Sequence, residues 1–268
     1  MPPQDSDSQY KEVFLTPLRE CLHYVPQLGG NTEQGINLDR FQTMYGADPL
    51  YSWIGLDSPA MYAAHKAAGG ITSVYRQLGI GCERLARAVF RDALHLSHEQ
   101  LLWGYDVVND GGRVSRITLD AKIDLIEVSD IARRDLIQQW IVQTGTSIGI
   151  TPSKCALLRG AVFEVRQGYK SADSKRQNAD LRSALKASQQ DFLPIVMVIS
   201  SQINSTVQRR YTSSGLSIMV GKSEGPITKN TFTFYRDVIG YDLAAFFDRN
   251  KDAFRSEVQA IVSSLLSA

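Results

Sequence analysis

The sequence predicts an α/β fold in which a mixed β-sheet core is flanked by helices. A glycine-rich turn at residues 109–112 stands between two segments of strand character, which is typical of a β-hairpin. Residues 156–165 and 192–200 are apolar runs expected of strands buried on both faces. Helical patterns separate these runs, so we expect parallel strands joined by crossover helices.

Length and composition fit one domain spanning residues 1–268, 43% hydrophobic, with no need for disulfides. The 29 basic and 28 acidic residues nearly balance, so any DNA-binding surface must be local. The sequence shows no signal peptide and no apolar run of roughly 18 residues, so we expect no membrane partner. Cys21, Cys82 and Cys155 have no metal-binding spacing and are expected to be reduced thiols of a cytoplasmic protein.

The domain is expected to have three parts. Residues 1–93 form a mainly helical N-terminal part, residues 100–220 an α/β core, and residues 229–268 helical additions at the C-terminus. In the first part, helices are predicted over residues 10–24, 58–68 and 72–93.

The core begins with the predicted hairpin, whose strands are residues 101–108 and 113–128. The second strand alternates strictly, with an apolar face formed by Ile117, Leu119, Ala121, Ile123 and Leu125. Its other face carries Asp120 and Asp124, which flank Lys122. Two carboxylates therefore share one face of this strand.

The remaining elements follow in order. Ser129 or Asp130 caps a helix to about residue 144, with buried positions at Ile131, Leu136, Trp140 and Ile141. A capping-box pattern at residues 174–177 opens a helix to about residue 190. A helix over 203–211, a strand over 216–220 and helices from residue 231 complete the chain.

Glu164 and Arg166 form the centre of the candidate site. On an extended strand they face the same way, and Gly168 allows a bend that returns Lys170 toward them. Opposite charges at the end of a buried strand are costly unless they pair or serve a site. Mg²⁺-assisted phosphodiester hydrolysis would use Glu164 with Asp120 or Asp124 as metal ligands, and either Arg166 or Lys170 as the assisting cation.

The helix that follows carries a concentrated basic face. Lys175, Asn178, Arg182 and Lys186 recur at helical spacing. A solvated helix face has the same pattern. Its first turn, however, comprises Lys175, Arg176, Gln177 and Asn178, whose donors and acceptors match base edges. Gln202, after the 192–200 strand, is a further candidate for DNA contact.

Residues 163–182 together with 192–202 resemble the central region of ApaLI-like type II restriction endonucleases, as do 119–125 and 241–247. The resemblance implies a PD-(D/E)xK nuclease fold, a homodimer, and Mg²⁺. It further implies a bacterial restriction-modification system that cleaves double-stranded DNA within a short palindrome, GTGCAC for the family's namesake. In the family motif the strand ends in Glu-x-Lys, and Arg166 occupies the lysine position here. In a second alignment residues 168–170 end the motif strand and Asp180 is the carboxylate, while Glu83 is a candidate accessory ligand.

Two other functions are consistent with the same residues. One is a structure-specific repair or junction nuclease of the same fold, and the other is a non-catalytic DNA-binding protein in which Glu164 and Arg166 are only an ion pair. The sequence leaves open which bases are read and where a dimer interface would lie.

Overall fold

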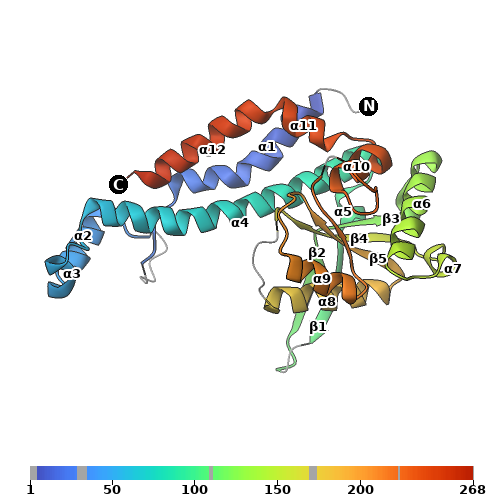
Figure 1. The fold of residues 1–268 in the computed structure, drawn as a ribbon, viewed down its shortest axis with the longest axis horizontal. Helices are drawn as coiled ribbons and strands as arrows, with labels where there is room; N and C mark the ends of the chain where they lie inside the picture. Colours follow the sequence, from blue (N-terminus) through green and yellow to red (C-terminus); the bar gives the residue numbers. More distant parts are fainter. Residues whose placement is uncertain (1–4, 29–34, 109–110, 169–173, 223, 268) are drawn as a thin grey trace. The chain divides into compact units, whose positions relative to one another are not determined.

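The computed structural model describes residues 5–28, 35–108, 111–168, 174–222 and 224–267, and these form a mixed α/β fold, as predicted (Figure 1). The helices of more than five residues are α1 (Asp5–Arg19), α2 (Leu38–Gly46), α4 (Pro59–Leu94), α6 (Ile131–Ser147), α8 (Ser174–Ser188), α9 (Ser205–Ser213), α11 (Leu243–Arg249) and α12 (Lys251–Leu266). The shorter ones are η1 (Glu20–His23), α3 (Pro49–Trp53), α5 (His98–Leu101), η2 (Leu125–Glu127), α7 (Pro152–Cys155), α10 (Thr231–Phe234) and the π-helix η3 (Tyr235–Ile239). The strands are β1 (Trp103–Val108), β2 (Val114–Leu119), β3 (Ala121–Asp124), β4 (Gly160–Arg166), β5 (Phe192–Val198) and β6 (Ser217–Met219).

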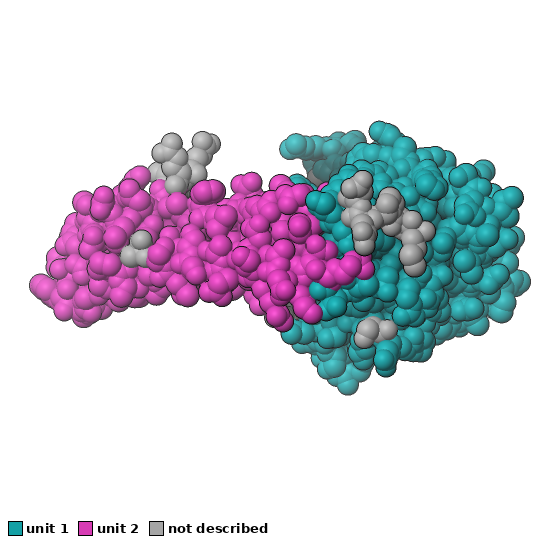
Figure 2. Space-filling model, turned by 90° about the horizontal axis from the view of Figure 1, so that it is seen from above, with its two compact units in different colours: residues 1–10, 82–248 teal, residues 11–81, 249–268 magenta. Residues whose placement is uncertain are grey.

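The chain divides into two compact units, coloured teal and magenta in Figure 2. Unit 1 comprises residues 1–10 and 82–248, and unit 2 comprises residues 11–81 and 249–268. The unit boundaries fall inside α1, α4 and α11.

One helix replaces the two predicted over residues 58–68 and 72–93. α4 continues through Gly69 and Gly70, so the prediction of a break was wrong. A Cβ at Gly69 would collide with the Tyr24 hydroxyl, and one at Gly70 would collide with Leu265 of α12. These glycines therefore allow close packing and do not end the helix.

The four-stranded sheet of unit 1 has the order β3-β4-β5-β6. β3 is antiparallel to β4, while β4, β5 and β6 are parallel, as the crossover helices predict. On one face, Phe163 of β4 contacts Phe90 of α4, Trp140 of α6 and Phe234 of α10. On the other, Val162 packs with Ala187 of α8. Because side chains alternate along a strand, Glu164 and Arg166 share the face that α8 covers.

The predicted strand over residues 113–128 is two strands in two sheets, and it ends at Asp124, where the 3-10 helix η2 follows. β2 pairs with β1 in a two-stranded sheet, whereas β3 pairs with β4. The chain bends at Asp120 between them. The residue alternation continues across the bend, so the sequence pattern does not reveal it.

The polar face predicted for this strand is not solvent-facing at Asp124. The Asp124 side chain is only 4% exposed and accepts a hydrogen bond from Arg159 Nη2 at 2.7 Å, with Lys122 Nζ at 4.0 Å. The ion pair compensates the charge of a carboxylate at the start of β4.

The helix predicted after residue 130 is α6, with Asp130 as its N-cap accepting from Arg133 N. Trp140 and Ile141 are buried as predicted. Ile137 and Thr144 are buried beside Trp140 and Ile141. Ile131 and Leu136, which were predicted to be buried, are exposed. The buried stripe is therefore rotated relative to the predicted one.

None of the described helices combines the length and apolar composition needed to cross a bilayer. Cys21, Cys82 and Cys155 are buried free thiols.

The Asp124–Arg159 pair predicts a stability difference between two arginine variants. Arg159→Ala removes the nearer cation of the buried Asp124 carboxylate and leaves Lys122, whose Nζ is 4.0 Å away. The substitution should lower the free energy of unfolding by about 1–2 kcal/mol. Arg116→Ala removes an ion pair to Asp106 in which both side chains are more than half exposed. This substitution should change the free energy of unfolding by less than about 0.5 kcal/mol. Urea titration of both variants measures the difference, and equal effects would contradict this role of Arg159.

Candidate active site

Asp120 and Glu164 come together where β3 begins and β4 approaches its end. Ala121 pairs with Phe163 in the antiparallel register, which places Asp120 beside Glu164. Asp120 Oδ2 accepts a hydrogen bond of 2.7 Å from the backbone N–H of Val165. The bend between β2 and β3 thus positions a carboxylate next to the one on β4.

Arg166 adds a cation on the same face of β4. Its Nη2 forms an ion pair with Glu164 Oε1 and a second one, at 3.0 Å, with Asp180 Oδ1 of α8. The side chains of Arg166 and Glu164 are 11% and 13% exposed. The two charges predicted to face the same way therefore do so, and they contact each other.

Burial and like charges disfavour the ionised form of both carboxylates. Burial, with the neighbouring charge of Asp120, raises the pKa of Glu164 to about 8, although Arg166 opposes the shift. Burial also raises the pKa of Asp120, against the Val165 hydrogen bond and the charge of Arg166. Glu83 of α4 adds to the shift of Glu164, so the candidate accessory carboxylate lies within electrostatic reach. Such crowded carboxylates favour a bound cation.

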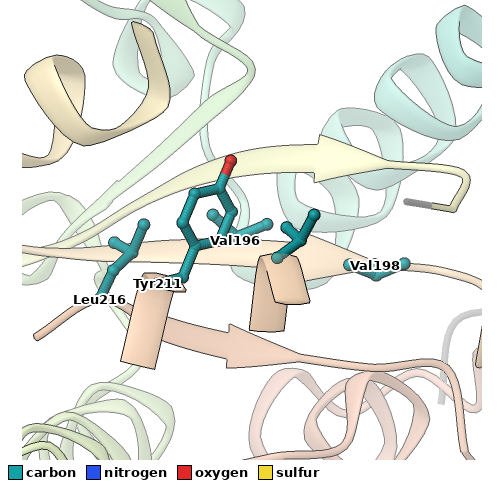
Figure 3. Packing of buried hydrophobic residues seen from close by; sticks show 5 residues of the cluster. Val196, Val198, Tyr211 and Leu216 are labelled. Atoms are coloured by element: carbon teal, nitrogen blue, oxygen red, sulfur yellow. The ribbon is translucent and has the colours of Figure 1, made fainter. Parts of the chain in front are cut away.

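Asp180 is held between two elements of the unit. Its Oδ2 accepts a hydrogen bond of 2.6 Å from the Tyr211 hydroxyl of α9, opposite the oxygen that contacts Arg166. The Tyr211 ring packs with Val196, Val198 and Leu216, and its hydroxyl points out of that cluster (Figure 3). Tyr211 is missing from the site predicted from the sequence, because an aromatic residue on a helix is usually core and its partner lies 31 positions away.

The basic face of α8 is exposed as predicted. Lys175, Asn178 and Arg182 line an open hollow of about 750 Å³ together with Leu181 and Leu185. These residues present donors and acceptors to solvent along the helix.

Gln177 differs from the other polar residues predicted to read bases. It is buried, and Arg210 Nη1 of α9 donates to its Oε1 at 3.0 Å, while Arg210 Nη2 donates to Asn178 Oδ1 at 2.6 Å. Gln177 therefore joins α8 to α9 in this structure. Arg210 is likewise missing from the predicted site, because its sequence pattern is that of an exposed helix position.

The remaining predicted residues lie apart or are not described. Asp124 pairs with Gly160 at the start of β4, four residues from Glu164, which is about 13 Å at roughly 3.3 Å per residue. The structure thus brings Asp120, and not Asp124, to Glu164. Lys170 and the Arg176 side chain lie outside the described residues. Gln202 is exposed, and its carbonyl oxygen lies near Gly168, so the segments after β4 and β5 adjoin.

The carboxylates of the site are the groups that would hold the expected Mg²⁺. Within the described ranges, His, Cys, Asp and Glu residues form no group of three or more arranged to hold a metal ion. Mg²⁺ is commonly held by one or two carboxylates and otherwise by water and substrate oxygens. Asp120 and Glu164 supply two hard oxygen donors in a negatively charged setting, so this pair fits Mg²⁺.

Comparisons of the chain with protein-family models, curated proteins and solved structures found no match.

The raised pKa of Glu164 predicts a pH-dependent effect of Glu164→Gln on stability in metal-free buffer. The folded protein holds the Glu164 proton more tightly than the unfolded chain does, so ionisation costs stability as pH rises toward about 8. Glutamine cannot ionise. The stability of the variant relative to wild type should therefore increase between pH 5 and pH 8, by roughly 1 kcal/mol or more, and then level off. Denaturant unfolding with a chelator measures this, and a pH-independent difference would refute it.

Proposed function

We propose that this protein is a Mg²⁺-dependent endonuclease that hydrolyses phosphodiester bonds of double-stranded DNA. The observation that carries the proposal is the meeting of Asp120 and Glu164 beside the buried Arg166. Two carboxylates and a cation at one sheet edge are the groups that metal-assisted phosphoryl transfer requires.

The roles follow from the chemistry of each side chain. Asp120 and Glu164 would hold Mg²⁺. When bound, the ion supplies positive charge that stabilises the negative charge developing on the phosphate. Arg166 would stabilise charge on a phosphate oxygen or orient the attacking water through its guanidinium N–H groups. Lys170 stays the alternative cation, and Glu83 an accessory carboxylate.

The exposed face of α8 is the proposed DNA-contacting surface. Lys175 and Arg182 present positive charge next to the hollow. Asn178 also lines the hollow; its Oδ1 accepts a hydrogen bond from Arg210, and its amide NH2 group is able to donate to a base edge. Asp180 lies on the opposite, buried side of the same helix. Phosphate contact and the Arg166 network would therefore depend on one rigid element.

The finer proposal is a homodimeric type II restriction enzyme of the ApaLI-like group, cutting within a short palindrome such as GTGCAC. It is supported by the sequence resemblance. A twofold-symmetric dimer would match a palindromic site. A repair or junction nuclease would use the same catalytic groups but would recognise the shape of DNA.

One observation favours a second function, that of a non-catalytic DNA-binding protein. Arg166 is already paired with Glu164 and Asp180, as a structural ion pair would be. Incubating purified protein with a sequenced plasmid in Mg²⁺ separates the alternatives. Discrete fragments indicate a restriction enzyme, cutting confined to branched DNA indicates a junction nuclease, and binding without cleavage in Mg²⁺ or Mn²⁺ refutes the nuclease.

Asp120→Asn and Glu164→Gln should each lower Mg²⁺-dependent cleavage by at least about 1,000-fold, because each removes a proposed metal ligand. DNA binding in Ca²⁺ should persist. Asp106→Asn, at an exposed position on β1, is the matched control and should cleave normally. Full activity of either site variant, with folding confirmed by circular dichroism, would exclude the assigned ligand.

Arg182→Ala should weaken binding to DNA of any sequence and reduce the slope of log affinity against log salt by about 1, because one phosphate contact is lost. Lys154→Ala removes an exposed charge from α7 and should leave the slope unchanged. Fluorescence anisotropy over a range of salt concentrations measures both. An unchanged slope for Arg182→Ala would remove Arg182 from the DNA-contacting surface.

A further inference from the structure

The buried guanidinium of Arg166 lies between two carboxylates on different elements. One, Glu164, belongs to the proposed metal site, and the other, Asp180, lies on α8 with its side chain 6% exposed. The same atom, Nη2, contacts both. Arg166 therefore has a partner outside the metal site as well as one inside it.

Asp180 is fixed in place independently of Arg166. Tyr211 donates to its second carboxylate oxygen at 2.6 Å, which is a charge-assisted hydrogen bond. Tyr211 is itself fully buried, with its ring packed against Val196 and Leu216 (Figure 3). Asp180 thus presents its other oxygen to Arg166 from a rigid position.

This arrangement matters when a cation enters the site. A divalent ion on Asp120 and Glu164 would repel the adjacent guanidinium and compete with it for Glu164. A buried guanidinium that loses its partner is costly unless another carboxylate keeps it paired. At 3.0 Å, Asp180 already provides that partner.

We propose that Asp180, held by Tyr211, is a positioning residue that retains Arg166 in the site when a divalent cation replaces it on Glu164. The inference rests on the proposed function, since it assumes a cation on Asp120 and Glu164. Without Asp180, Arg166 would stay on Glu164 and the ion would have to displace it. Asp180 therefore favours metal loading through Arg166.

A double-mutant cycle tests this with Mn²⁺ binding measured by calorimetry, without DNA. Asp180→Asn should weaken Mn²⁺ binding by roughly five- to tenfold in the wild-type background. In the Arg166→Met background, the same substitution should change Mn²⁺ binding by less than about twofold, because the competing guanidinium is absent. An equal loss in both backgrounds would show that Asp180 acts only as a distant negative charge, which overturns the proposal.

Two further variants separate positioning from general damage to α8. Tyr211→Phe keeps the ring in its cluster but removes the hydrogen bond, and should weaken Mn²⁺ binding by about two- to threefold. Ser183 is a buried residue of α8 whose hydroxyl hydrogen-bonds with Tyr105 of β1. Ser183→Ala should leave Mn²⁺ binding unchanged. If Ser183→Ala weakens binding as much as Asp180→Asn does, the effect is a general one and the positioning role is refuted.

Cleavage kinetics supply a second readout. Asp180→Asn should raise the Mg²⁺ concentration giving half-maximal rate more than it lowers the rate at saturating Mg²⁺. Wild-type protein that binds neither Mn²⁺ nor Mg²⁺ would overturn the proposed function together with this inference. Wild-type binding with no coupling between Asp180 and Arg166 would overturn the positioning role alone.

Discussion

Strand β4 is buried on both faces but ends in charged residues, and unit 1 is arranged around the need to compensate them. Trp140, Phe234 and Phe90 cover one face of the strand. On the other face, Glu164 and Arg166 need partners because unpaired charges in an apolar layer are unstable. α8 supplies Asp180 as a partner of Arg166, whereas the bend before β3 adds Asp120, whose negative charge raises the pKa of Glu164.

The compensation at this sheet edge is incomplete, and this distinguishes it from the ion pair at the start of β4. There, Asp124 accepts a hydrogen bond from Arg159, and Lys122 lies nearby. At the other end, Asp120, Glu164 and Asp180 surround Arg166, and the pKa of both Asp120 and Glu164 is raised. An excess of buried negative charge costs stability, which a function that binds a cation would explain.

The sequence predicted the elements whose signal is local. The apolar runs of β4 and β5 and the Asp130 N-cap of α6 depend on neighbouring residues and are present. The separation of β2 from β3 depends on which strands they pair with, and an unbroken alternation carries no such information. Likewise, Gly69 and Gly70 look like a helix break until Tyr24 and Leu265 are placed beside them.

The same distinction explains what was predictable at the site. The common direction of Glu164 and Arg166 follows from the period of a strand, whereas choosing Asp120 over Asp124 requires the β3–β4 register. Tyr211 and Arg210 join the network through contacts about 30 residues away in sequence, which no local pattern encodes.

The helical period of α8 divides its residues between two faces. Asp180 and Gln177 face inward to Tyr211 and Arg210, while Lys175, Asn178 and Arg182 face outward, with Asn178 also accepting a hydrogen bond from Arg210. Asp180 and Arg182 belong to different faces, so under the proposed function substitutions at these two positions would alter metal loading and DNA affinity separately.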